Sequence, residues 1–347
     1  MADNTQAVEN HVIKRGGVRI DYVAWIQAVG VVLVVFGHSM NSIEMPDILY
    51  SLRAWVYTFH MPLFFLVSAY LFAYYGGFNH KGGYWGTLKG KFSRLMLPYI
   101  IWNAAFVLPK LLFANYINDD VELSVPYFMK LAVYPRENIL GHTWFLFVLF
   151  ELFVLAIIFE KLRAKRQLWI PVLALLILVN CFGVEGRLLA YEDVLKDAVF
   201  FWIGLMLGSY KVEDVQKWGK DTLLLVAVLL LAIIGTVVWV YNPWMNINVV
   251  ILAVAMIIAI GMVQIRYSIS GSLIYFISRN AFAIFIIHWP VMLVIRLVFY
   301  QKLHLAPLPT IALMFVGGLT ISMLIAWLVR KCKTTFMKGF AKVVLGM

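Results

Sequence analysis

The sequence predicts an all-α fold, that of a polytopic integral membrane protein with about ten transmembrane helices and both termini in the cytoplasm. Three observations support this prediction. Of the 347 residues, 63% are hydrophobic and only 14% are charged, whereas about a quarter of a soluble domain is charged. The apolar residues form blocks of roughly 17–22, the length that crosses a hydrocarbon core about 30 Å thick. The Lys and Arg residues fall mainly between these blocks, on alternate connections.

The polar breaks between the blocks define the individual spans. The first block follows a polar segment and has no small-x-small cleavage site behind it, so we interpret it as an uncleaved span rather than a signal peptide. Pro171, Pro290 and Pro309 lie within or at the start of spans, which membrane helices tolerate. The ten predicted spans are 22–40, 54–75, 95–115, 142–159, 168–184, 195–210, 221–241, 247–264, 280–299 and 309–329.

The basic residues indicate the orientation. With the N-terminus inside, 21 of the 29 Lys and Arg residues fall on inside connections or termini and six on outside ones, as the positive-inside rule requires. We ascribe the net charge of +11 to this bias, and expect no nucleic-acid partner because no basic stripe is interleaved with aromatic residues. The predicted organisation is a cytoplasmic segment over 1–21, a membrane domain over 22–329 and a basic cytoplasmic tail over 330–347.

Five polar residues lie at predicted membrane depth, where such groups are expensive and usually functional. They are His38, His60, His142, Glu151 and His288. Each also has a structural interpretation: a histidine can hydrogen-bond a neighbouring helix, His60 can repair a kink at Pro62, and Glu151 can pair with an Arg or Trp. No two of the four histidines share a face at i, i+4, so we expect no metal site.

Buried neutral histidines suit acyl transfer to a hydroxyl group. An alcohol is a poor nucleophile until a base removes its proton, and the pKa of histidine suits that step. The sequence has no Gly-x-Ser-x-Gly elbow, Walker motif or dinucleotide fingerprint that would indicate other chemistry.

Several segments, in this order, resemble the acyltransferase-3 family of membrane acyltransferases, in particular its fucose 4-O-acetylase-like branch. The resemblance covers nearly the whole chain, and its first two motifs are fairly specific together. The matching segments are Arg-Ile-Asp-Tyr at 19–22, Val-Val-Phe-Gly-His-Ser at 34–39, the Phe-His-Met-Pro segment that opens 59–72, Phe-Ser-Arg-Leu-Met-Leu-Pro-Tyr at 92–99, His-Thr-Trp-Phe-Leu at 142–146 and Ile-Phe-Ile-Ile-His-Trp-Pro at 284–290.

The resemblance implies a cytoplasmic acyl-CoA donor, an acceptor that is a carbohydrate or glycolipid, and an essential histidine at His38. Relatives carry Arg or Lys at the position of Gln27, eleven residues before His38. On a helix, Gln27 and His38 lie on nearly the same face about 16 Å apart, which suits a long pantetheine arm. Arg19 and Arg94 are candidates for the CoA phosphates, and Arg94 is favoured because Arg19 lies about 100° from His38 around the helix.

We therefore hypothesise an O-acyltransferase that moves an acyl group, expected to be acetyl, from acyl-CoA to a hydroxyl of an envelope or exported glycan. His38 would be the general base, with His60 and Glu151 orienting it or shaping the pocket. The protein would lie in the cytoplasmic (inner) membrane of a bacterium. Two alternatives stay open: a transporter or flippase of lipid-linked sugars, and a catalytically weak acyltransferase-like binding protein.

Overall fold

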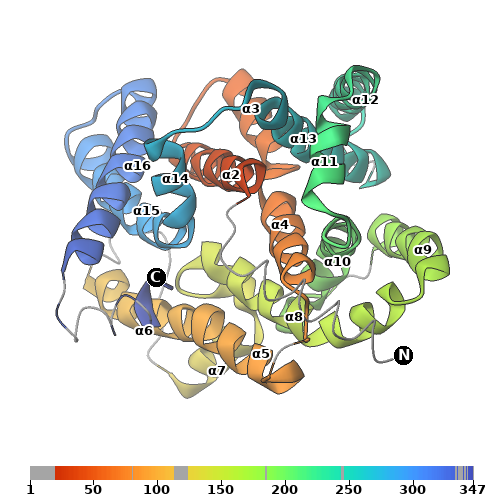
Figure 1. Cartoon of the computed structure of the whole chain (residues 1–347). Helices are drawn as coiled ribbons and strands as arrows, with labels where there is room; N and C mark the ends of the chain where they lie inside the picture. The colour runs from red at the N-terminus through yellow and green to blue at the C-terminus, as the bar shows by residue number, and fades with distance from the viewer. Residues whose placement is uncertain are drawn as a thin grey trace.

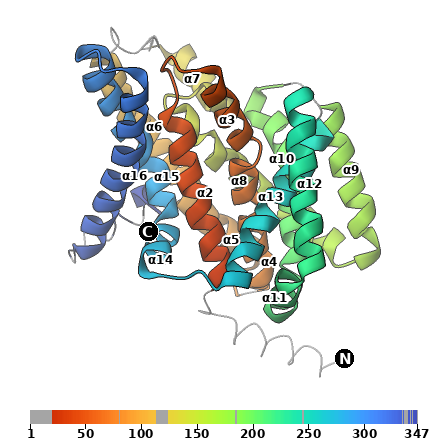
Figure 2. The same ribbon diagram turned by 90° about the horizontal axis from the view of Figure 1, so that it is seen from above.

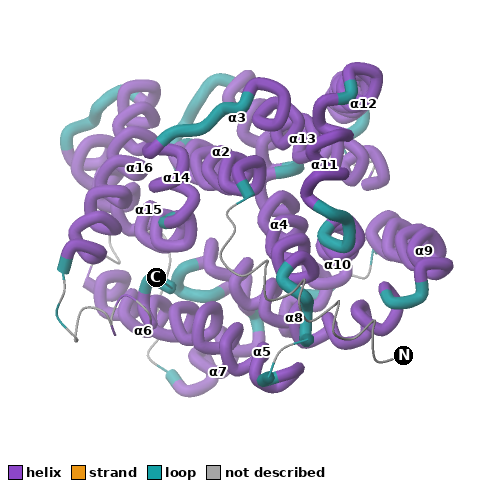
Figure 3. Tube along the Cα trace, viewed as in Figure 1, coloured by secondary structure: helices purple, strands orange, loops and turns teal. Residues whose placement is uncertain are grey.

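The structure is a computed structural model that describes residues 20–346 apart from 80, 113–123, 184–185, 244–245, 333, 335–338, 340 and 342. Every regular element within these residues is a helix, as Figure 3 shows, and the prediction of an all-α fold is confirmed for them.

The helices fall into long ones and short ones. The long ones are α2 (Asp21–Ser39), α4 (His60–Tyr74), α6 (Leu97–Leu112), α8 (Trp144–Arg163), α9 (Trp169–Phe182), α10 (Tyr191–Leu207), α12 (Thr222–Tyr241), α13 (Asn246–Tyr267), α15 (Ala281–Ile295) and α16 (Pro307–Lys331). The short ones are α3 (Asp47–Tyr57), α5 (Gly83–Lys91), α7 (Val125–Val133), α11 (Val212–Lys220) and α14 (Ser272–Arg279).

In the described part of the chain, seven helical stretches are long and apolar enough to cross a membrane. They are Asp21–Ser39, Asp47–Tyr74, Gly83–Leu112, Thr222–Tyr241, Asn246–Tyr267, Ala281–Lys302 and Pro307–Lys331. Each overlaps one predicted span. The three other predicted spans coincide with α8, α9 and α10, of which α9 has 14 residues and α10 has 17. The total of ten spans therefore stays a prediction.

The helices run between two faces of the bundle, which we call proximal, where α2 begins, and distal, where α2 ends. Figure 2 shows α11 and α14 towards the proximal face, and α3 and α7 towards the distal face. The last turn of α16 is also proximal, because Arg330 donates from Nε to the Asn280 side chain at the end of α14. The described chain thus begins α2 and ends α16 on the same face.

Helix α2 lies at the centre of the bundle and packs against α4, α13, α14, α15 and α16 (Figure 1). Two glycines permit its closest contacts. A Cβ at Gly30 would lie 2.7 Å from the Leu63 side chain of α4, and one at Gly37 would overlap the Tyr57 ring. The approach at Gly37 places Tyr57 beside His38, one residue further along α2.

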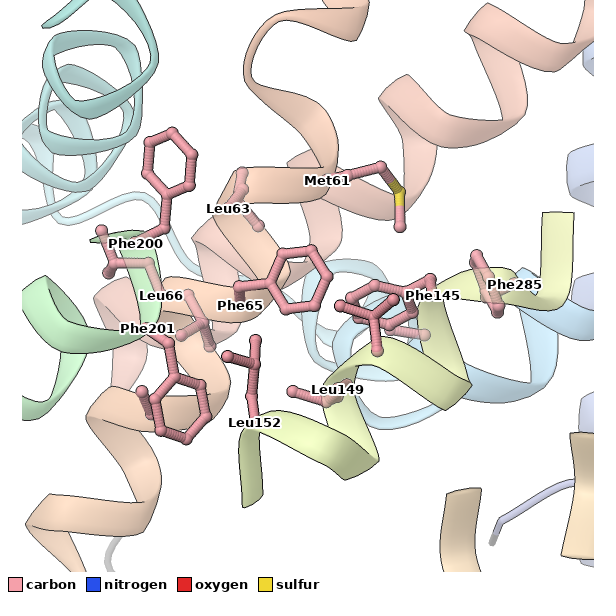
Figure 4. Close-up of a cluster of buried hydrophobic side chains, with 14 of the residues drawn as sticks. Met61, Leu63, Phe65, Leu66, Phe145, Leu149, Leu152, Phe200, Phe201 and Phe285 are labelled. Atoms are coloured by element: carbon pink, nitrogen blue, oxygen red, sulfur yellow. The ribbon is translucent and has the colours of Figure 1, made fainter. Parts of the chain in front are cut away.

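Helix α10 packs closely against α4 through a Gly-x-x-x-Gly motif. A Cβ at Gly204 would overlap the Leu66 carbonyl oxygen, and one at Gly208 would overlap the Tyr70 carbonyl oxygen. Small residues four apart let two membrane helices bring their backbones together. Figure 4 shows the apolar core that surrounds this contact, in which Phe65 and Leu66 of α4 meet side chains of α8 and α10.

The predicted span 54–75 consists of two helices rather than one. Helix α3 ends at Tyr57 and α4 begins at His60, with a turn between them. Pro62 therefore lies in the first turn of α4 and has no N–H to offer the Thr58 carbonyl four residues earlier. The break lies at Thr58 and Phe59, where this carbonyl is, as the interpretation of a kink caused by Pro62 expects.

The predicted span 95–115 begins earlier, as α5, and passes through a π-helical turn at Phe92–Met96 into α6. Pro98 explains the irregular turn, since proline has no N–H to offer the carbonyl of Arg94 four residues earlier. Such turns in a helix often occur at functional sites. This one contains Arg94.

Candidate active site

A cavity of about 360 Å³ lies in the distal half of the bundle. It is bounded by side chains near the distal ends of several helices, three of them histidines. The lining residues are His38, Tyr57, Thr58, His60, Met61, Pro62, Arg136, His142, Trp144, Asn180, Asp193, Lys196, Asp197, Phe200, Asn246, Val249, Val250 and Phe285.

His38 lies in the last turn of α2 and is surrounded by aromatic rings. The centre of its imidazole is 5.2 Å from those of His288 and Trp289, and 6.2 Å from that of His142. His142 and His288 are themselves 5.5 Å apart. Three of the four membrane histidines thus form one cluster, although they come from segments far apart in the sequence.

Arg53 fixes the side-chain amide of Asn41 and, through it, the tautomer of His38. Arg53 Nη1 donates to Asn41 Oδ1 at 3.0 Å, and the Tyr57 hydroxyl donates to the same oxygen at 3.4 Å. With Oδ1 facing these donors, Asn41 Nδ2 donates to His38 Nδ1 at 3.0 Å. A neutral imidazole has one acceptor nitrogen and one donor. Nδ1 of His38 therefore holds the lone pair, and Nε2 holds the proton.

His60 and His288 have the opposite tautomer. His60 donates from Nδ1 to the Val56 carbonyl at 3.0 Å, and His288 donates from Nδ1 to the Ile284 carbonyl at 3.0 Å. A carbonyl can only accept, so Nδ1 carries the proton and Nε2 the lone pair in both rings. The His60 bond also spans the break between α3 and α4, which gives this residue a structural role beside its place in the cavity.

Several imidazole nitrogens in the cluster have no hydrogen-bond partner. Both ring nitrogens of His142 and Nε2 of His288 are buried and have no hydrogen-bond partner. Unsatisfied buried polar atoms are rare and call for an explanation such as a functional role. Among the residues that the structure describes, no group of three or more His, Cys, Asp or Glu is arranged to hold a metal ion.

A second cavity, of about 560 Å³, lies in the proximal half of the bundle. Its lining includes Gln27 of α2 and the basic residues Lys91, Arg94 and Arg279. Ser278 donates to Gln27 Oε1 at 2.9 Å. Lys91 Nζ lies 3.7 Å from the centre of the Phe153 ring. In the described part of the chain no ion pair engages Arg94, so this cavity presents unneutralised positive charge.

Phe285 of α15 lines both cavities and separates them. Its ring centre is 5.5 Å from that of Phe145, which lines the proximal cavity, and 5.5 Å from that of His142, which lines the distal one. Figure 4 shows Phe145 and Phe285 side by side at the end of the apolar core. The cavities therefore approach each other from opposite faces and meet at an aromatic wall beside the histidine cluster.

The structure brings some of the predicted site residues together and not others. His38 and His60 share the distal cavity, and Gln27 and Arg94 share the proximal one. Arg19 lies outside the described residues.

Glu151 lines neither cavity. It lies two residues from Leu149, a residue of the proximal cavity, and so points about 200° away from it around α8. The role in orienting His38 or shaping its pocket thus gains no support from the geometry.

Sequence reasoning missed the residues that support His38. Asn41, Arg53 and Tyr57 come from the connection after α2 and from α3, and nothing in their spacing indicates that they meet at a histidine. Trp289 adjoins His288, and nothing in the sequence pattern indicates that its ring lies against His38. A partial signal existed for Arg53, since it is one of only six basic residues on the connections assigned to the outside.

Comparison with known proteins supplies one match. The model of a family whose description reads acyltransferase domain matches residues 20–327. No curated protein and no solved structure matches the chain. The matched segment extends from the residue before α2 into α16, and it contains the histidine cluster, the aromatic wall and all but the C-terminal part of the proximal cavity.

Proposed function

The chain belongs to the acyltransferase-3 family, and on this premise we propose that it is an acyl-CoA-dependent O-acyltransferase. Acyl-CoA, expected to be acetyl-CoA, binds the proximal cavity from the cytoplasm, and a glycan hydroxyl enters the distal cavity from outside. The observation that supports this most is the pair of cavities on opposite faces, which meet at Phe285 beside the histidine cluster.

The proximal cavity suits the donor in charge and in length. Arg94, Lys91 and Arg279 offer positive charge to the phosphates of CoA. The pantetheine arm then runs along α2 from Gln27 towards His38, about 16 Å further along the helix axis. Gln27 takes the place of a cation in the family pattern, and the nearby basic residues supply that charge.

His38 acts as the general base on the acceptor. The hydroxyl donates its proton to Nδ1, the nitrogen that holds the lone pair, and so takes the place of the Asn41 amide, which donates to that lone pair at 3.0 Å in the absence of acceptor. The hydroxyl oxygen attacks the thioester carbonyl, a C–O bond forms and the C–S bond breaks. The thiolate of CoA leaves and takes up the proton from His38. Such base catalysis contributes about 10²–10⁴ in rate.

The activity is tested with purified protein in lipid nanodiscs and radiolabelled acetyl-CoA. We expect release of CoA thiol by slow hydrolysis and faster release with a glycan acceptor. A well-folded protein that neither hydrolyses nor transfers the acetyl group would contradict the proposed function and favour a transport or binding role.

The orientation in the membrane is tested by cysteine labelling. Glu44, in the distal connection after α2, and Lys165, in the proximal connection after α8, are both exposed. In a variant without Cys181 and Cys332, we expect an impermeant maleimide to label Glu44→Cys in intact cells and Lys165→Cys only after permeabilisation. Labelling of both positions from one side would contradict the proposed topology.

Arg94 is expected to bind the donor. Arg94→Ala should weaken acetyl-CoA binding by about 2 kcal/mol, or roughly 30-fold in Kd, as for a hydrogen bond to a charged group. Gln27→Ala should cost less, and Gln27→Arg should preserve or improve affinity. Calorimetry in nanodiscs can rank the variants, with Lys89→Ala as control because Lys89 is exposed and does not line the cavity. Unchanged affinity in Arg94→Ala would refute its role.

A further inference from the structure

The last described residues of the chain return to the helix bundle. We call residues 343–346 the tail segment. The Trp102 side chain of α6 donates from Nε1 to the Val344 carbonyl oxygen at 2.9 Å. Leu345 is 2% exposed. It belongs to a small apolar cluster whose other buried members, from α15 and α16, are Ala283, Ile287 and Ala326. The tail segment is therefore in contact with three helices.

These contacts close a gap between helices. Within the described residues, α6 does not pack extensively against α15 or α16. The tail segment joins them, because its backbone accepts a hydrogen bond from Trp102 of α6 and its Leu345 side chain packs on α15 and α16. Its removal would open this side of the bundle.

The tail segment is also part of the wall of the proximal cavity. Leu345 and Gly346 line this cavity together with Gln27 and Arg94. Gly346 has a φ of 61°, a conformation that glycine adopts readily. A Cβ at Gly346 would lie 2.6 Å from the ring of Phe282, which lines the same cavity. The backbone of the tail segment thus lies directly against an aromatic side chain of the cavity.

The chemistry of this wall differs from that of the basic residues in the cavity. Leu345, Gly346 and Phe282 carry no charge, so they suit the uncharged pantetheine arm of CoA. Arg94 and Lys91 suit its phosphates. The match to the family model ends at residue 327, and the tail segment therefore lies outside the matched domain.

We propose that the tail segment is a wall of the donor site that contacts the pantetheine arm, and that Leu345 is the positioning residue that anchors it there. The inference rests on the proposed function, since the ligand is the acyl-CoA of the same site. A docked wall that contacts the ligand stabilises the complex. By reciprocity the bound ligand stabilises the docked wall. Docking of the tail segment and binding of the donor are therefore coupled.

Docking is measured by maleimide labelling of the full chain in nanodiscs, in variants without Cys181 and Cys332. Leu345→Cys should react slowly because Leu345 is buried, and Gly339→Cys should react rapidly because Gly339 is exposed. CoA should slow the reaction at Leu345→Cys at least about 5-fold and leave Gly339→Cys unchanged. The adenosine bisphosphate portion of CoA, which has phosphates but no pantetheine arm, should slow neither reaction.

Affinity for CoA is measured by calorimetry. Leu345→Asp places a charge in an apolar pocket, so it should release the tail segment and raise the Kd for CoA at least about 5-fold. Leu345→Met, an apolar side chain of similar volume, should bind CoA as wild type. Gly339→Asp is the matched control, because it adds the same charge where a Cβ would meet no atom within 4 Å. It should also bind CoA as wild type.

Hydrolysis of acetyl-CoA separates this role from a general loss of structure. No residue of the tail segment lines the distal cavity, where His38 lies. Leu345→Asp should therefore raise the KM for acetyl-CoA and leave kcat close to that of wild type. A collapsed protein would lose kcat instead.

Four results would overturn the wall: rapid labelling of Leu345→Cys, labelling there that CoA leaves unchanged or accelerates, equal protection by the adenosine bisphosphate, or wild-type affinity for CoA in Leu345→Asp. Acceleration by CoA would mean that the tail segment competes with the donor. Any of these results in a protein that hydrolyses acetyl-CoA would refute the wall and uphold the enzyme. A wild type that binds no CoA would refute the proposed function itself, and with it the ligand of this wall.

Discussion

Replacement of His38 by alanine is expected to abolish acyl transfer and leave the fold intact. Loss of a general base lowers turnover by about 10²–10⁴. Because the base acts on the reacting hydroxyl and not on CoA, the loss should appear in kcat, with little change in the affinity for acetyl-CoA. Initial rates with radiolabelled acetyl-CoA, together with calorimetric binding of the donor, separate the two effects.

The control for this experiment is a histidine away from the site. His304 is exposed in the connection before α16, and it has a positive φ of 50°, a conformation that asparagine tolerates. We expect His38→Asn to be as inactive as His38→Ala, and His304→Asn to behave as wild type. Wild-type turnover in a well-folded His38 variant would remove His38 from the mechanism. The unpartnered nitrogens of His142 and His288 would then be the candidates for the general base.

Replacement of Gly204 by leucine is expected to prevent stable assembly of α10 on α4. The Cβ would overlap the carbonyl oxygen of Leu66, a backbone atom in a buried helix that cannot rotate away. Overpacking a core costs 1–3 kcal/mol, and a backbone clash belongs at the upper end, so we expect a loss of about 3 kcal/mol. Thermal unfolding in detergent, followed by size-exclusion chromatography, measures it.

Gly90 provides the matched control for Gly204. It is also a helical glycine, but a Cβ there would meet no atom within 4 Å. Gly90→Ala should leave stability unchanged or raise it slightly, since alanine favours helix over glycine by up to about 1 kcal/mol. If Gly204→Leu unfolds at the wild-type temperature, then the close contact between α4 and α10 does not limit the stability of the bundle.

The sequence predicted the long helices well because hydropathy along the chain reports a helix that faces lipid or apolar core. The span predicted at 221–241 is α12, Thr222–Tyr241, and Asp221 caps it by accepting from the Leu224 N–H. The same signal cannot resolve helices that lie near the membrane surface. Helices α3 and α11 are short and amphipathic, and their polar faces read as breaks between spans. The break at Thr58 and Phe59 falls inside an apolar block, where hydropathy does not show that one helix ends and another begins.

For the candidate site, the sequence predicted residues whose polarity contrasts with their apolar surroundings. His38 and His60 were found in this way. Glu151 shows the limit of that reasoning, since polarity does not reveal which face of α8 a side chain occupies. Asn41, Arg53 and Tyr57 were missed because they adjoin loops or lie near span ends, where polar residues are ordinary. Their importance arises from contacts between segments distant in sequence, which no pattern along the chain encodes.

The aromatic wall at Phe285 has a consequence for the membrane as a whole. Two cavities that enter a bilayer protein from opposite faces would form a pore if they joined, and a pore would dissipate the gradients across that membrane. Phe285 and Phe145 are 5% and 6% exposed, so apolar rings occupy the place of closest approach. The two rings offer no polar partner to water or ions, whereas a small apolar acyl group would have favourable apolar contacts with them. The side chains that lie between donor and acceptor in the proposed reaction thus also act as an electrical insulator.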